Sequence, residues 1–193
     1  MADDLKKHFD ALWQYTLAAY KREGVPATCL ALQDRYGLDV NVLFLCLFAG
    51  ARGHELPTHE FALIDDIVAP WKEGVIHPLR SVRRLLKARI PSSPELVGTL
   101  YRNVLTSEIK AEEHEHYLIA TTLRIPAGAA DDAITAVNLV RYFRLSGAPV
   151  NHDSITILAN LMSGVTTDTT AIEAQRLLKQ SSLSLPPLET GKG

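Results

Sequence analysis

Residues 37–53 read GLDVNVLFLCLFAGARG and contain the densest apolar run of the chain, which is interrupted only by Asn41 and one glycine. The run predicts a helix over about 39–52. Asp39 can accept a hydrogen bond from an amide of the first turn, and Gly53 can end the helix in the left-handed conformation. Apolar residues fall on every side of this helix, so neighbouring segments have to cover it. We therefore expect it to be the centre of the fold.

The whole chain has the composition of a folded protein. Its 193 residues are 47% hydrophobic and 22% charged, which fits one domain with a substantial core. The formal net charge of −2 provides no overall field that would attract nucleic acid or an anionic membrane. The longest apolar run has about twelve residues, fewer than the roughly 20 that span a bilayer. No secretory signal begins the chain, and its two cysteines form no disulfide framework, so we expect a cytoplasmic protein.

Helical periodicity and chain breakers organise the rest of the sequence. No segment shows the alternating pattern of a strand, and no repeat is present. We expect an all-α fold: a single domain over 1–180 that forms an orthogonal or irregular bundle of about seven to eight helices, followed by a disordered tail over 181–193. The boundaries expected at chain breakers are a helix start at Val25-Pro26, a helix end at Pro70, a division at His77, a long helix from Pro94 to Leu123, and a last helix capped by Thr167-Asp168 that ends near Lys179.

Residues 31–42 have the glycine turn of a helix-turn-helix motif. A recognition helix has to present polar or basic side chains to base edges and phosphates. Here that helix would read VNVLFLCLFAG, which offers almost nothing that contacts DNA. The sequence therefore predicts a structural role for this segment and no binding of nucleic acid.

Four cations, Arg80, Arg83, Arg84 and Lys87, recur at the spacing of one helix face. They could form an anion site for a phosphate or carboxylate, because the guanidinium group presents a planar fork of donors. They could equally be a solvated face or take part in ion pairs with neighbouring helices. Both alternatives remain open at the level of sequence.

Acidic residues at Glu108 and Glu112 match this basic row. If the two helices form an antiparallel hairpin about the turn at 91–94, facing residues have numbers that sum to about 183. Glu108 then comes within reach of Arg80, whereas Glu112 falls beyond it. The other three cations have no evident partner within the hairpin.

Glu113 and His116 have the Glu-x-x-His spacing found in di-iron helical bundles. Such a site needs a second copy of the motif, and the sequence has none. His54, His59 and His77 could add a ligand, but no geometric reason selects among them. We therefore predict an exposed charged helix face with no metal and no cofactor.

Two tryptophans and two amides form what we call the aromatic–amide set: Trp13, Gln33, Asn41 and Trp71. The tryptophans suit large core anchors, and buried amides require hydrogen-bond partners. The amides could hold two helices in register, or the set could line a ligand pocket. If function involves the central helix, we expect it at the polar start that begins with Asp39.

Short blocks spread over the chain are typical of one protein family. The blocks are Trp13, Tyr20, Val25, Cys29-Leu30, Leu32-Gln33, Asp39-Val40-Asn41, Trp71, Pro78-Leu79-Arg80, Val82-Arg83, Leu86-Lys87, Glu108, Ala111-Glu112 and Asn138-Leu139. Together they resemble an uncharacterised proteobacterial family, the domain of unknown function numbered 2390, up to about residue 163. Because the family has no assigned activity, the resemblance implies no catalytic residues.

Two functional hypotheses follow. The first is a binding or protein-interaction module without catalytic activity, in which Arg80, Arg83, Arg84, Glu108 and Glu112 form a polar seam that meets a protein or a small anionic ligand. The second is a small-ligand-binding protein or an enzyme, with a pocket at the central helix lined by the aromatic–amide set. No phosphate loop or nucleophile motif supports catalysis. Homo-oligomerisation stays open.

Overall fold

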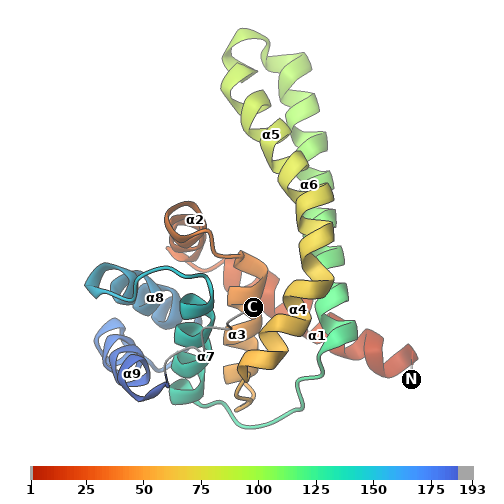
Figure 1. Ribbon diagram of the computed structural model, residues 1–193. Helices are drawn as coiled ribbons and strands as arrows, with labels where there is room; N and C mark the ends of the chain where they lie inside the picture. Colours follow the sequence, from red (N-terminus) through yellow and green to blue (C-terminus); the bar gives the residue numbers. More distant parts are fainter. Residues whose placement is uncertain (1, 187–193) are drawn as a thin grey trace, which may run out of the picture. The chain divides into compact units, whose positions relative to one another are not determined.

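The computed structural model describes residues 2–186, and within that range the chain is helical without strands, which confirms the all-α class (Figure 1). The elements are α1 (Ala2–Tyr20), α2 (Val25–Tyr36), α3 (Val40–Gly50), α4 (Thr58–Trp71), the π-helical segment η1 (Lys72–Ile76), α5 (His77–Arg89), the 3-10 turn η2 (Ile90–Ser92), α6 (Pro94–Thr122), α7 (Asp132–Leu145), α8 (His152–Val165) and α9 (Ala171–Ser184). Over the described range, none of these helices has the length and apolar character needed to cross a membrane.

The chain divides into two compact units. Unit 1 contains Met1–Phe9 and Ala62–Arg124, and unit 2 contains Asp10–Phe61 and Ile125–Gly193. Helices α1 and α4 each contribute residues to both units. The single domain expected over 1–180 therefore stays a prediction.

Helix α3 lies at the centre of unit 2, as the sequence predicts. Every residue from Asn41 to Gly50 is buried. The Asp39 carboxylate accepts a hydrogen bond from the amide of Asn41 at 2.9 Å, which confirms the predicted N-cap. Helix α7 packs so closely against α3 that a Cβ atom at Gly50 would lie 1.9 Å from the hydroxyl oxygen of Thr135. A glycine is required there.

Unit 2 also contains α8 and α9, whose ends differ from the sequence expectations. Helix α8 begins with a capping box between Asn151 and Ser154 that the sequence reading missed. Helix α9 is capped by Thr170 instead of Thr167-Asp168, and it continues to Ser184, past the expected end near Lys179. Residues 181–184 are therefore helical, and residues 187–193 of the expected tail lie outside the described range. Arg144 explains the extension, since it donates hydrogen bonds to three backbone carbonyls, those of Ser182, Leu185 and Pro186.

Unit 1 contains an unbroken helical path from α4 through η1 into α5, so the expectation that Pro70 ends a helix is wrong. Proline has no amide hydrogen, so residue 70 cannot donate a hydrogen bond to the carbonyl of Asp66. Pro70 is exposed, so water can bond that carbonyl instead. The π-helical segment then leads into Pro78 in the first turn of α5, where its missing amide is tolerated. The division expected at His77 is confirmed as the start of α5.

Helices α5 and α6 form an antiparallel hairpin in unit 1 (Figure 1). Helix α5 contains no buried residue. Leu79, Leu86 and Ile90 are half-buried, but Val82, which the periodicity predicts on the same face, is 45% exposed. One helix can cover only one side of α5, so this hairpin is a single layer of two helices.

Candidate functional site

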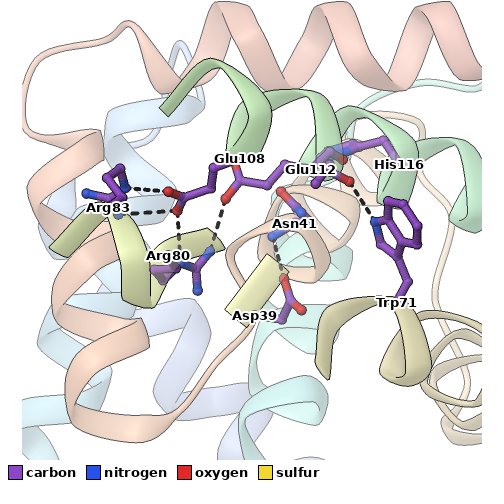
Figure 2. A network of polar contacts seen from close by, with 9 residues as sticks. Asp39, Asn41, Trp71, Arg80, Arg83, Glu108, Glu112 and His116 are labelled. Atoms are coloured by element: carbon purple, nitrogen blue, oxygen red, sulfur yellow. Dashed lines mark hydrogen bonds and ion pairs between the residues drawn. The ribbon is translucent and has the colours of Figure 1, made fainter. Parts of the chain in front are cut away.

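An ion cluster joins α5 to α6 and contains four of the five residues of the predicted polar seam (Figure 2). Glu108 lies at its centre and is only 4% exposed. One carboxylate oxygen of Glu108 accepts hydrogen bonds from Arg80 Nε and Arg83 Nη2, both at 3.2 Å, and the other accepts from Arg83 Nε. Arg80 Nη2 also donates to Glu112 at 3.0 Å.

The cluster contains two guanidinium groups and two carboxylates, so its formal charges cancel. The hydrogen bond to Glu108 raises the pKa of Arg83, and this effect exceeds the lowering effect of burial. An external anion would have to compete with a buried carboxylate for the same donors. The charged groups of the cluster therefore pair with one another, and these ion pairs hold α5 on α6.

The pairing of Arg83 with Glu108 corrects the register expected from the sequence. In a helix, each Cα–Cβ bond tilts toward the helix N-terminus. The side chain of Arg83 therefore leans away from the turn, and that of Glu108 leans toward it. Because of these opposite leans, Glu108 bonds an α5 residue that lies nearer the turn than its backbone neighbour does. That residue is Arg83.

Arg84, the fifth residue of the polar seam, is exposed on α5, and so is Lys87. The role of Arg84 in a ligand or partner site stays a prediction.

The aromatic–amide set is divided between the two units. Trp13, Gln33 and Asn41 belong to unit 2, and Trp71 belongs to unit 1. Trp13 and Gln33 are half-buried, and Asn41 is 7% exposed. Trp71 donates from its indole Nε1 to the carbonyl of Ala111 at 2.9 Å, so it anchors the start of η1 to α6. The ligand pocket stays a prediction.

The two candidate metal ligands on α6 have other contacts, and the expected exposed helix face is wrong at His116, which is fully buried. Lys110 donates a hydrogen bond to Glu113. The Nδ1 atom of His116 lies 2.9 Å from the carbonyl of Glu112, so it carries the proton and donates to that carbonyl. From residue 2 to residue 186, no three His, Cys, Asp or Glu side chains form a group that could hold a metal ion.

A buried amide at Asn138 is a structural feature that the sequence reading missed. Its Oδ1 accepts from the amide of Leu56 at 2.8 Å, and its Nδ2 donates to the carbonyl of His54 at 2.9 Å. Asn138 is fully buried in α7, where it holds the loop that follows α3. The available signal was an amide inside the apolar stretch AVNLV, the pattern already noted for Asn41.

The turn end of the hairpin carries exposed leucines whose exposure the sequence reading did not anticipate. We call residues 82–102 the hairpin tip. Its exposed large apolar side chains, with their exposed fractions, are Val82 (45%), Leu85 (66%), Leu96 (80%) and Leu100 (50%). Its exposed cations are Arg84, Lys87, Arg89 and Arg102, and Glu95 is its one acidic residue. The tip thus combines apolar surface with positive charge.

Comparison with known proteins assigns the sequence of this chain to a family. No curated protein and no solved structure matches the chain. The model of a family described as a protein of unknown function, DUF2390, matches residues 11–119, which is more than half of the chain. The match includes α3 and the whole of α5, and it ends inside α6, so Asn138-Leu139 lies beyond it. The chain belongs to the DUF2390 family of proteins of unknown function.

Proposed function

We propose that the α5–α6 hairpin is the part of this protein that binds another protein, and that the chain is an interaction module without catalytic activity. The observation that carries this proposal is the exposure of four large apolar side chains within the hairpin tip. Single exposed apolar residues are common on folded proteins, but a cluster of them marks an interaction surface. A layer of two helices leaves such a surface uncovered.

The ion cluster supports this role by fixing the hairpin before a partner arrives. Glu108 bonds both Arg80 and Arg83, so α5 is held in one register on α6. A surface that is already ordered loses less conformational entropy on binding than a flexible one. In this proposal the ion cluster of Arg80, Arg83, Glu108 and Glu112 stabilises the docking surface and does not itself contact the partner.

Site-specific photo-crosslinking in host cells tests the proposed function. A photoreactive amino acid at Leu96, which is 80% exposed, is compared with the same residue at Leu183, which is 88% exposed on α9. We expect discrete crosslinked adducts from position 96 and none from position 183. Equal labelling at positions 96 and 183 would contradict the proposal. So would the absence of a discrete adduct both from position 96 and from a second probe at Leu85.

A further inference from the structure

We infer that a second copy of this chain covers the apolar side of the hairpin tip, so that two α5–α6 hairpins pack together as a four-helix bundle. This inference rests on the proposed function, because it names the protein molecule that the hairpin tip binds. It follows from where the apolar and the charged side chains of the tip lie around the two helices.

Helix α5 carries its exposed apolar side chains on one side and two of its cations on the opposite side. Successive residues of an α-helix are about 100° apart around its axis. Val82 and Leu85 are therefore only about 60° apart. Arg84 lies about 160° from Val82, and Lys87 lies about 160° from Leu85. The apolar side and the basic side of α5 are thus separate.

Helix α6 is divided in the same way. Leu96 and Leu100 are about 40° apart around its axis, so they share one side. Arg102 lies about 120° from Leu96 and about 160° from Leu100. The exposed cation of α6 therefore lies away from the two leucines.

An ion pair shows which sides of the two helices face the same way. Arg80 precedes Arg84 by one turn on the basic side of α5, and it donates to Glu112 of α6 at 3.0 Å (Figure 2). Around α6, Glu112 lies about 80° from Arg102 in one direction and about 120° from Leu100 in the other. The basic sides of α5 and α6 therefore face one way, and their apolar sides together face the other.

The four apolar side chains consequently form one patch that is two helices wide. At the level of the backbone, residues that face each other across the hairpin have numbers that sum to about 183. Val82 therefore lies level with Leu100, and Leu85 lies nearly level with Leu96. All four side chains are 45% to 80% exposed. The patch is compact, and within the chain it is not covered.

A second copy of the chain matches this patch in width and in symmetry. An identical hairpin is also two helices wide, so it covers the α5 row and the α6 row together. Because each copy contributes the same patch, the contacts close in a twofold dimer, which is the commonest symmetry of soluble oligomers. The result is a four-helix bundle, in which each helix packs against two neighbours around a shared apolar core.

The positions of the charges are compatible with this pairing. Arg84, Lys87 and Arg102 lie on the side turned away from the patch, so in the dimer they stay in water on its two outer faces. Arg89 is the exposed cation of the tip that lies on the apolar side of α5, four residues after Leu85. It is the last residue of α5, where its long side chain can extend past the contact into water. A charged partner would instead have to bury its charges against leucines.

The size of the patch predicts a weak dimer. Helix α5 has 13 residues, which gives a length of about 20 Å, and two helices side by side are also about 20 Å wide. A contact of this size buries less than the roughly 1,200 Å² at the lower end of stable specific interfaces. We therefore expect a reversible equilibrium between monomer and dimer that depends on the protein concentration.

Sedimentation equilibrium of the full-length protein tests the inference at concentrations from about 1 μM to about 1 mM. We expect the mean mass to rise with concentration from that of one chain towards that of two. The variant Leu85→Glu with Leu96→Glu should stay a monomer throughout, because it places carboxylates on both sides of the contact. Its circular dichroism spectrum should be unchanged, since both positions are exposed.

Two further samples separate loss of the contact from damage to the fold. Ile172→Glu with Leu183→Glu makes the same change of charge at α9 side chains that are 83% and 88% exposed, and it should dimerise like the unmodified chain. Leu85→Lys with Leu96→Lys should be a monomer alone. Mixed with the glutamate variant of the same two positions, it should form a heterodimer. Association restored by opposite charges cannot result from a damaged fold.

Several outcomes would overturn the inference. The unmodified chain could keep the mass of one chain at every concentration, the tip variant could dimerise as well as the unmodified chain, or the α9 variant could lose the dimer. A mixture of the glutamate and lysine variants that stays monomeric would also contradict the pairing of the two patches.

The crosslinking experiment distinguishes this failure from a failure of the proposed function. We expect the adduct from position 96 to have the mass of two chains. If the chain is a monomer and position 96 crosslinks to a different protein in cells, the proposed function stands and only the second copy is wrong. If the chain is a monomer and position 96 gives no crosslink, both fail.

Discussion

Helices α3 and α5 are of similar length and are held in opposite ways. Helix α3 has 11 residues and buries all of them after the first, whereas α5 has 13 residues and buries none. Apolar contacts on all sides hold α3, and they depend on shape and volume. Two arginines bonded to one buried glutamate hold α5, and these contacts depend on charge and direction. A helix held in the second way can leave most of its surface available to a partner.

The largest expected effect compares the same substitution in the two regions. Gly50→Ala would place a Cβ atom 1.9 Å from the Thr135 hydroxyl oxygen and 2.6 Å from the Thr135 Cα atom. Helices α3 and α7 would have to separate, so we expect a loss of about 3 kcal/mol or more in the free energy of unfolding. Gly74→Ala in η1 meets nothing within 4 Å, so the change should be at most about 1 kcal/mol, in the stabilising direction. Urea unfolding followed by circular dichroism measures both, and similar losses in the two variants would refute the contrast.

A smaller effect is expected when the charge of Glu108 is removed. Glu108→Gln keeps the shape of the side chain but leaves two partly buried guanidinium groups without their shared carboxylate. We expect the free energy of unfolding to fall by about 1–3 kcal/mol. Glu173, which pairs with Arg176 on the surface of α9, provides the matched control. Glu173→Gln should cause no measurable change, and equal effects of the two substitutions in urea unfolding would show that the cluster does not hold the hairpin.

Alkaline pH should weaken unit 2 through its two buried thiols, Cys29 and Cys46. Burial raises the pKa of Cys29 from 9.0 to about 12. Between pH 9 and pH 12 the unfolded chain loses the thiol proton and the folded chain keeps it, so stability decreases as the pH rises. From pH 9 to pH 10 we expect a loss of about 1 kcal/mol from this group. Cys29→Ser should reduce the slope of the stability profile over this interval, and part of the slope should remain because burial also raises the pKa of Cys46. An unchanged slope in urea titrations would contradict the assignment.

The smallest effect on stability is expected at the hairpin tip. Leu85→Ser with Leu96→Ser removes two side chains that are 66% and 80% exposed. The free energy of unfolding should change by less than about 0.5 kcal/mol per site, because little buried area is lost. The matched core variant, Leu45→Ala in α3, should lose about 2–5 kcal/mol. A comparable loss in the tip variant, measured by thermal unfolding, would mean that the leucines pack within the protein.

The sequence predicted α3 almost completely because its signals are local. The N-cap at Asp39 and the uninterrupted apolar run depend only on neighbouring residues. The end at Pro70 was predicted wrongly, since an exposed proline can remain inside a helix when water reaches the freed carbonyl. The sequence shows that a proline removes one helical hydrogen bond, but it does not show whether water can replace that bond.

The candidate site was predicted only in part. The hairpin register placed Arg80 within reach of Glu108 correctly, but it put Glu112 beyond Arg80 and gave Arg83 no partner. Both of these bonds depend on the lean of long side chains. The exposure of Leu96 was not predicted either. Periodicity shows which residues share a face, and it does not show whether another helix covers that face.

Hydrogen exchange of the full-length protein, resolved by mass spectrometry, tests the contrast between the two helices most directly. Amides of α3 should exchange only through global unfolding, whereas amides of α5 should exchange at least about 100-fold faster through local opening of the hairpin. Equal protection of α5 and α3 would contradict the account, because it would mean that α5 is held as firmly as the buried centre of unit 2.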